Sequence, residues 1–155
     1  MLRLAEEIRS GQRATDKVDE LVAELLGVNR TDARCLDILE QDGRISAGKL
    51  ASSSGLSTGA VTAVVDRLQR AGYARRVPDP TDRRRVFVEL TERARELIWE
   101  LMGRPMREAG RPMIDSYSDA ELELLIEFQR RGREMQERHA EWLRAQTPTP
   151  QRDHR

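Results

Sequence analysis

Arginine is concentrated in one short part of the chain, between positions 67 and 85. Seven arginines lie there beside only two acids, Asp79 and Asp82, although the 155-residue chain has a formal net charge of zero. Guanidinium groups bind phosphate oxygens through paired N–H donors, and a basic patch inside a neutral protein is typical of nucleic-acid binding. We therefore predict that this stretch contacts a phosphate backbone. The arginines are Arg67, Arg70, Arg75, Arg76, Arg83, Arg84 and Arg85.

The other reactive side chains form no pattern that supports catalysis. Carboxylates are abundant but lie among arginines, with no nucleophile beside a base and no glycine-rich phosphate loop. His139 and His154 have no second histidine or cysteine at metal-ligand spacing. We therefore expect neither an enzyme nor a metal or cofactor site. Cys35 is the only cysteine, and we interpret it as a small buried hydrophobe, with an oxidant-sensing thiol as the alternative.

A helix near residues 57–71 must position the first of these arginines. Val61, Val64, Val65 and Leu68 recur at helical spacing and predict one buried stripe. Ser57 or Thr58 can cap the start of this helix, and Gly72 can end it. If its amino-terminal part enters a major groove, five short side chains face the bases, namely Ser57, Thr58, Gly59, Thr62 and Ala63.

None of those five side chains can make the bidentate base contacts of arginine, asparagine or glutamine. Base selection would therefore rest on hydroxyl groups, thymine methyl contacts and DNA shape. Phosphate contacts are assigned to Arg67, Arg70, Arg75 and Arg76, which would position the protein without reading sequence. Asp66 either pairs with Arg70 on the helix surface or is simply solvated.

Two strands follow this helix, at residues 73–77 and 85–90. Val86, Val88 and Leu90 alternate with polar or larger neighbours, as in a half-buried strand. Pro78 and Pro80 cannot donate hydrogen bonds in a sheet, so residues 78–84 are predicted to form a protruding hairpin tip. A helix followed by a basic hairpin indicates a winged helix.

The chain before this unit is predicted to be helical. Residues 2–26 should form a helix in two parts, weakened at Gly11, whose apolar stripe needs a partner. Asn29 can cap a second helix that runs to about residue 41, and Ser46 a third over 47–54. Gly55 would turn the chain into the helix of residues 57–71, which completes a helix-turn-helix. The amino-terminal segment carries acids and no apolar run, so we expect no signal peptide or membrane span, and a cytoplasmic protein.

Helices are also predicted after the hairpin. Thr91 can cap the next one, with interruptions at Gly103/Pro105 and again at Gly110/Pro112. Ser118 and Glu121 form a capping box for the last helix. A heptad-like seam runs along it through Leu125, Phe128, Gly132, Met135, His139 and Trp142. The polar, proline-rich residues 146–155 should be a disordered tail.

Three segments together resemble the MarR family of bacterial transcription regulators. NRTDARCLDIL is similar to the family's second helix, SAGKLASSSGLSTGAVTAVVDRLQRAGY to its helix-turn-helix, and DPTDRRRVFVELT to its wing. The wing's Asp-x-Arg signature falls on Asp82 and Arg84. The resemblance covers residues 29–91 and implies a homodimer, a pseudo-palindromic operator, and a small-molecule or oxidant effector.

On this basis we expect a mainly α fold with a small β-hairpin wing. Residues 1–28 and 91–145 would be dimerisation helices, and 29–90 the DNA-binding lobe. Arg84 would enter a minor groove, held by Asp82 and flanked by Arg83 and Arg85; the alternative is a solvated turn.

The predicted function is that of a dimeric, sequence-specific repressor of double-stranded DNA. A small apolar or aromatic effector would bind in a cleft that the Gly/Pro interruptions open, and would release the DNA. The apolar side chains of the terminal helices would mostly form the dimer core. The alternative is a winged-helix module that binds protein without specific DNA binding.

Overall fold

The computed structural model describes residues 2–79, 81–82 and 85–146. Two compact units divide the chain, Met1–Met106 and Arg107–Arg155, and each is described by itself. The first unit contains α1 (Leu2–Leu26), α2 (Arg30–Asp42), β1 (Ile45–Ser46), α3 (Ala47–Ser54), α4 (Thr58–Arg70), β2 (Ala74–Pro78), β3 (Val86–Leu90), α5 (Glu92–Ile98) and a π-helical turn, η1 (Trp99–Gly103). The division falls within α6 (Arg104–Ile114), and α7 (Asp119–Gln146) belongs to the second unit.

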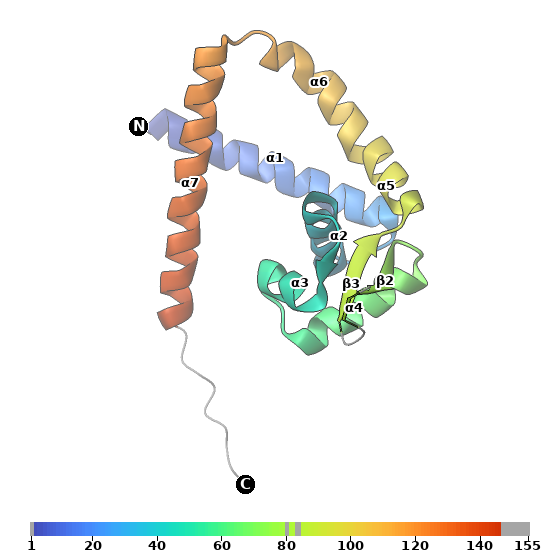
Figure 1. Ribbon diagram of the computed structural model, residues 1–155. Coiled ribbons are helices and arrows are strands. Elements are labelled where there is room, and N and C mark those ends of the chain that lie inside the picture. The colour runs from blue at the N-terminus through green and yellow to red at the C-terminus, as the bar shows by residue number, and fades with distance from the viewer. Residues whose placement is uncertain (1, 80, 83–84, 147–155) are drawn as a thin grey trace. The chain divides into compact units, whose positions relative to one another are not determined.

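The core of the first unit is a winged-helix lobe in which α2, α3, α4 and the strands pack together (Figure 1). The predicted stripe of α4 is its centre, since Val61, Val64, Val65 and Leu68 are all buried almost completely. Leu50 and Ala51 of α3 face the same core. The helix-turn-helix and the mainly α fold class are therefore confirmed.

The predicted helix starts are also confirmed in detail. Each capping side chain accepts a hydrogen bond from a backbone N–H three residues later, which satisfies a donor that the helix itself leaves free. This holds for Asn29, Ser46, Ser57, Thr91 and Ser118. Glu121 completes the predicted capping box by accepting from the backbone N–H of Ser118 at 2.8 Å. Gly72 follows α4 with a φ of 77°, the left-handed conformation expected there.

The sheet has one strand more than predicted. β1 pairs with β3, and β3 with β2, both antiparallel, in the order β1-β3-β2. The prediction that Pro78 lies in the hairpin tip was wrong, because Pro78 is the last residue of β2 and is in register with Val86. β2 is an edge strand, where a residue without an N–H is tolerated.

The alternation predicted for β3 holds only in part. Val88 and Leu90 are buried, but Val86 is 42% exposed and the acid Glu89 is only 4% exposed. Two arginines bind the Glu89 carboxylate, and they compensate for the cost of burying it.

Two of the three predicted helix interruptions, at Gly11 and at Gly110/Pro112, are wrong. α1 continues through Gly11, because one glycine in a helix costs only about 1 kcal/mol. At Gly103 the α-helix is interrupted by the π-helical turn η1, and Pro105 follows in the first turn of α6, where its missing N–H is tolerated. Gly110 and Pro112 lie inside α6, which ends only at Ile114.

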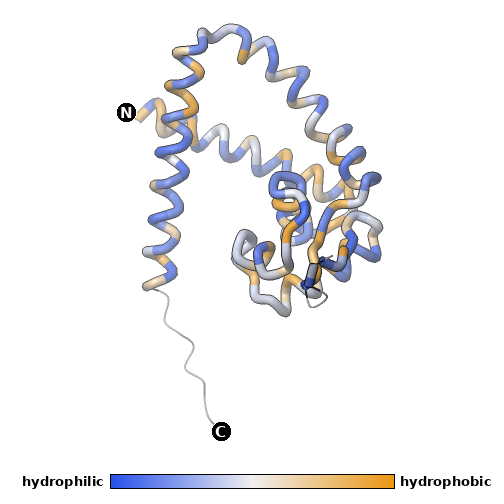
Figure 2. Tube along the Cα trace, viewed as in Figure 1, coloured by the Kyte–Doolittle hydropathy of each residue, from blue (hydrophilic) through white to orange (hydrophobic). Residues whose placement is uncertain are grey.

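Both ends of the chain carry helices with exposed apolar side chains. On α1, Leu21 is 45% and Leu25 71% exposed, and only Ala23 and Leu26 are buried. Apolar positions recur among polar ones along this helix (Figure 2). No residue of α7 is buried. The predicted tail, apart from Gln146 at the end of α7, lies outside the described residues.

Candidate nucleic-acid interface

α4 separates its buried stripe from an exposed face of short side chains. The five residues predicted to face DNA bases are all exposed: Ser57, Thr58, Gly59, Thr62 and Ala63. No Cβ placed on Gly59 would meet another described atom within 4 Å. The amino-terminal half of α4 is therefore open to a close-fitting partner.

The hydroxyl groups on this face are already oriented by the helix. Ser57 Oγ accepts from Ala60 N at 3.2 Å, which leaves its own proton to donate. Thr62 Oγ1 donates to the carbonyl of Thr58 at 3.0 Å, which leaves its lone pairs to accept. A partner would thus find a donor at Ser57 and an acceptor at Thr62, one turn further along the helix.

Arg67 is partly exposed and pairs with a buried acid. Its Nε lies 2.8 Å from Asp32 Oδ2 and its second guanidinium nitrogen 2.6 Å from Oδ1, a bidentate pair between α4 and α2. Asp32 is only 3% exposed. Arg67 thus has a partner inside the protein that the sequence did not reveal, and three of its N–H donors remain for a phosphate. The signal in the sequence was an acid at position 32, in helical register with the buried Cys35 and Leu39 of α2.

The next arginines are held by acids but remain exposed. Arg76 pairs with Asp66 at 2.7 Å and also binds Gln69. The Asp66 carboxylate therefore pairs with Arg76; Arg70 instead donates its Nε–H to the Asp66 carbonyl at 3.3 Å. A guanidinium has five N–H donors, so these contacts leave donors for a phosphate.

Glu89, on β3, forms ion pairs with two arginines. Arg44 Nε donates to Oε2 at 2.6 Å and Arg75 Nε to Oε1 at 2.7 Å. The hydrogen bond from Arg44 lowers the pKa of the Glu89 carboxyl, and Arg75 lowers it further, although burial acts in the opposite direction. The sequence did not identify Arg44 as a partner of Glu89, because the pairing of β1 with β3, which brings the two residues close together, was not predicted.

The end of the wing is organised by Asp79, which the sequence reasoning had not assigned a role. Asp79 Oδ1 accepts from Thr81 N at 2.8 Å, Thr81 Oγ1 at 2.6 Å and Asp82 N at 3.2 Å. These bonds lower the pKa of the Asp79 carboxyl, with the Thr81 hydroxyl contributing most. Asp followed two residues later by Thr is a turn-forming pattern that could have identified it.

The backbone closes the same turn. Asp79 N donates to the Arg85 carbonyl at 3.0 Å, and Arg85 N to the Asp82 carbonyl at 2.9 Å. Asp82 Oδ2 lies 3.7 Å from Arg85 Nε. Arg83 and Arg84, predicted to lie at the tip, are outside the described residues.

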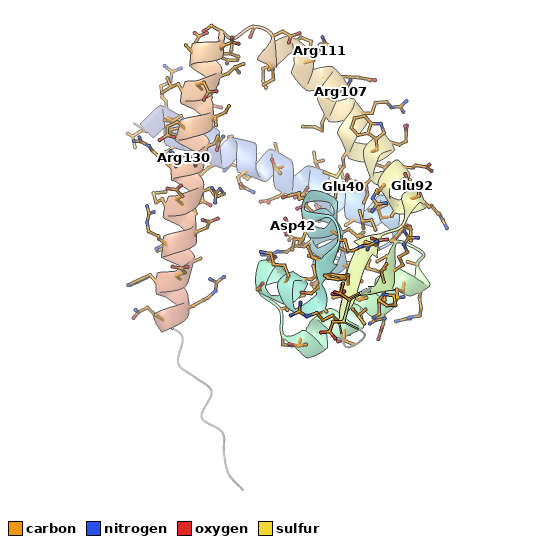
Figure 3. All side chains as sticks on the ribbon, in the orientation of Figure 1. Glu40, Asp42, Glu92, Arg107, Arg111 and Arg130 are labelled. Atoms are coloured by element: carbon orange, nitrogen blue, oxygen red, sulfur yellow. The ribbon has the colours of Figure 1, made fainter. Side chains whose placement is uncertain are left out.

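A cavity of about 590 Å³ lies within the first unit, away from the exposed face of α4. Its walls come from α1, α2, the end of α3, the turn before α4, the end of α5 and η1. Its apolar residues include Val22, Leu26, Leu36, Leu56, Ile98, Trp99 and Met102. Arg34, Asp37 and Glu40 follow one another along α2 at its edge, and Figure 3 labels Glu40 on that helix. Gly103 also lines the cavity, as predicted for a cleft near the first interruption.

Trp99 and Gly103 fit closely together in this wall. A Cβ at position 103 would overlap with the Trp99 indole ring. The π-helical turn places the ring directly over the glycine, so the shape of this wall depends on the absence of a side chain at Gly103.

Cys35 is completely buried in the core. Burial raises the pKa of its thiol, and the nearby Asp32 carboxylate raises it further. A protonated, inaccessible thiol reacts poorly, which favours the hydrophobic interpretation over oxidant sensing. In the part of the chain that the structure describes, no three potential ligands gather in a way that could hold a metal ion. None of the helices described there is both long and apolar enough to cross a membrane.

Comparison with known proteins points to one family. The family model described as "MarR family" matches residues 28–86. The uncharacterized HTH-type transcriptional regulator YcgE of Bacillus subtilis (strain 168) is 39% identical over 125 residues, which are 81% of this chain and 80% of YcgE.

Solved structures share the fold. FabT of Streptococcus pneumoniae in complex with DNA superposes with a TM-score of 0.62 at 21% identity, over 87% of this chain and 96% of FabT. NadR in complex with 4-hydroxyphenylacetate superposes with a TM-score of 0.61 at 20% identity, over 83% of this chain and 90% of NadR.

Proposed function

The chain belongs to the MarR family of DNA-binding transcription regulators, and we propose that it acts as a homodimeric repressor on a pseudo-palindromic operator. The observation that carries this proposal is α4, which buries one stripe completely and exposes an uninterrupted face of short side chains. A helix of this kind can enter the major groove without a bulky side chain holding it away. We propose that the protein acts in the cytoplasm and has no catalytic activity, as its relatives' descriptions as regulators suggest.

We propose that Ser57, Thr58, Gly59, Thr62 and Ala63 face the base edges. The free proton of Ser57 can donate to an acceptor such as guanine O6, and Thr62 can accept from an amino group of adenine or cytosine. In a dimer, two copies of α4 would lie in successive major grooves, with half-site centres about 34 to 36 Å apart.

The phosphate contacts are proposed for Arg70, Arg75 and Arg76. Arg75 and Arg76 are held by Glu89 and Asp66, so they lose little freedom on binding, while their side chains remain 61% and 36% exposed. Arg67 is proposed as a phosphate ligand too, because its pair with Asp32 uses only two of its five N–H donors and its side chain is 40% exposed. On the wing, Arg83, Arg84 and Arg85 are proposed to follow the minor groove, with Asp82 holding Arg84; for Arg84 the support is the family's Asp-x-Arg signature.

Salt dependence of duplex binding tests this proposal. A duplex is first selected from a random-sequence pool by the wild-type protein, and its affinity is then measured by fluorescence anisotropy. Affinity should fall linearly on a logarithmic salt scale, and Arg70→Ala should reduce the slope by about one unit. Arg67→Lys should leave the slope unchanged. A protein-binding module would show no saturable duplex binding and no such slope, and that result would refute the proposal.

Arg84→Ala tests the wing. Its affinity for the selected duplex should fall, most strongly for duplexes with a narrow A·T minor groove, whereas Arg138→Ala on α7 serves as a control for the loss of one positive charge. Unchanged affinity in Arg84→Ala would show that the wing assignment is wrong.

The proposed effector is a small apolar or aromatic molecule that binds in the cavity. Its volume of about 590 Å³ and its largely apolar lining suit a ligand of that size. A thermal-shift screen of aromatic acids and hydrophobic drugs, followed by anisotropy with the selected duplex, tests this. Hits should stabilise the free protein and weaken DNA binding; a panel without any response would count against the effector.

A further inference from the structure

Asp32 is a buried acid whose carboxylate connects two functional helices. Both of its oxygens bind the guanidinium of Arg67 on α4, at 2.6 and 2.8 Å. Oδ2 also accepts from Asn29 Nδ2 at 3.1 Å, and the Asp32 N–H donates to Asn29 Oδ1 at 2.9 Å. Asn29 therefore fixes the Asp32 carboxylate at the start of α2, and the carboxylate in turn binds Arg67 of α4.

α2 has the cavity on one face and the core on another. Arg30, Ala33, Arg34, Asp37 and Glu40 line the cavity, whereas Asp32, Cys35 and Leu39 are buried in the core; Leu36, between the two faces, is buried and also lines the cavity. At 3.6 residues per turn these two sets lie on nearly opposite sides of the helix. Thr31 and Ala33, the two neighbours of Asp32, both line the cavity. A displacement of this wall therefore displaces Asp32.

The ion pair transmits such a displacement better than the apolar contacts around it. α2 also packs on α4 through buried aliphatic side chains, but those contacts are non-directional and tolerate small shifts. A bidentate guanidinium–carboxylate pair fixes both distance and orientation. Arg67 cannot follow Asp32 without rotating or translating the helix that carries it.

We propose that Asp32 and Arg67 are positioning residues that couple occupancy of the cavity to the orientation of α4. The inference rests on the proposed function, in which α4 reads DNA and the cavity binds an effector. It adds the path between the two sites: a molecule in the cavity moves the first turns of α2, and the ion pair turns the recognition helix away from its groove.

A double-mutant cycle tests this path without a known effector. Ala33→Trp places an indole in the cavity from the α2 side and serves as a permanent occupant. In the otherwise wild-type chain it should weaken binding to the selected duplex by about tenfold, within the usual range for coupled sites. In an Asp32→Asn background, which keeps the shape of the side chain but loses the ion pair, the same substitution should change affinity by less than about twofold.

The background Asp37→Asn is the matched control. Asp37 lies on α2 and lines the cavity, but its carboxylate accepts from Gln41 Nε2 of the same helix, at 2.9 Å, and not from α4. In this background Ala33→Trp should still weaken binding to the selected duplex by about tenfold. If Asp32→Asn fails to fold by circular dichroism, Arg67→Lys replaces it, because lysine keeps the charge and loses the two-point geometry.

The outcomes separate the inference from the proposed function. If Ala33→Trp reduced duplex affinity equally in the Asp32→Asn and wild-type backgrounds, or in neither, the coupling path would be overturned. A wild-type protein that selects no duplex at all would instead refute the proposed function.

Discussion

Buried acids at single positions hold the DNA-binding lobe in shape. Asp32, Asp79 and Glu89 are each less than 10% exposed, and each carboxylate is bound by guanidinium, hydroxyl or backbone N–H groups. Among the described residues no buried side-chain oxygen or nitrogen lacks a partner. Because a buried charge is costly unless it is bound in this way, each of these acids makes its surroundings sensitive to substitution and to pH.

Stability should fall in acid through Glu89 and Asp79. The pKa of each is lowered in the folded protein. A lowered folded-state pKa contributes stability that is present above the unfolded-state value, about 4.3 for Glu and 3.9 for Asp, and is lost as pH falls through the folded-state value. Urea unfolding from pH 7 to pH 3 should show this loss beginning below about pH 4.5.

Glu89→Gln should remove part of that pH dependence. The substitution should also cost about 1 to 2 kcal/mol at pH 7, below the range for a fully buried pair because both arginines are about half exposed. Glu123→Gln on α7 is a control, and it should leave the pH profile unchanged. A Glu89→Gln profile identical to that of the wild type would contradict the role assigned to the lowered pKa.

Asp79→Ala should loosen the wing and spare the rest of the lobe. The substitution removes the acceptor of three hydrogen bonds that form the turn. Affinity for the selected duplex should fall by about tenfold while the helical circular dichroism spectrum is unchanged. Thr81→Val, which removes only the hydroxyl bond, should have a smaller effect; an effect as large would show that the Thr81 hydroxyl, and not the whole turn, matters.

At the scale of elements, η1 is the least regular part of the first unit. A π-helical turn is rare and is frequently found at functional sites. Here it brings Trp99 over Gly103 in the wall of the cavity, between α5, which packs on the lobe, and α6.

Gly103→Ala should therefore disturb both the cavity and the turn. The new Cβ would overlap with the indole ring, and overpacking of this kind typically costs about 1 to 3 kcal/mol. Trp99 fluorescence, recorded in a Trp142→Phe background, should shift in emission maximum. Gly110→Ala is the matched control, since a Cβ there meets nothing within 4 Å and alanine favours the helix. An unshifted spectrum in Gly103→Ala would show that the ring does not depend on the glycine.

At the scale of the whole molecule, the exposed apolar residues of the terminal helices need a partner. On α7 these include Leu124, Leu125, Phe128, Met135, Trp142 and Leu143. Exposed apolar surface of this extent marks interaction sites in soluble proteins. His139 stacks on Trp142 at 5.7 Å between ring centroids, so that part of the predicted seam is ordered by its own side chains.

The proposed homodimer predicts a mass in sedimentation equilibrium of twice the 17.8 kDa chain. Phe128→Glu should shift this equilibrium toward the monomer, because a charge is costly in an apolar interface. The same variant should bind the selected duplex more weakly, since a monomer has only one half-site contact. Gln136→Glu, at an exposed position of the same helix, controls for the added negative charge. A wild-type protein that remains monomeric would contradict the dimer.

The sequence by itself determined the helix starts and the buried and exposed faces of α4. Helical periodicity identified the buried stripe of α4, and short-range capping identified Asn29, Ser46 and Thr91, because both depend on residues three or four positions apart. The exposed face that presents Ser57 and Thr62 followed from the same periodicity.

Only the tertiary structure determined which charged residues pair when they lie far apart in the sequence. The pairs Asp32–Arg67 and Arg44–Glu89 are separated by 35 and 45 positions, and no spacing rule connects them. For the same reason arginines that looked equivalent, such as Arg67 and Arg70, have different partners inside the protein. A long-range ion pair depends on which elements the fold brings together and on how deeply it buries each acid, and both are properties of the whole lobe.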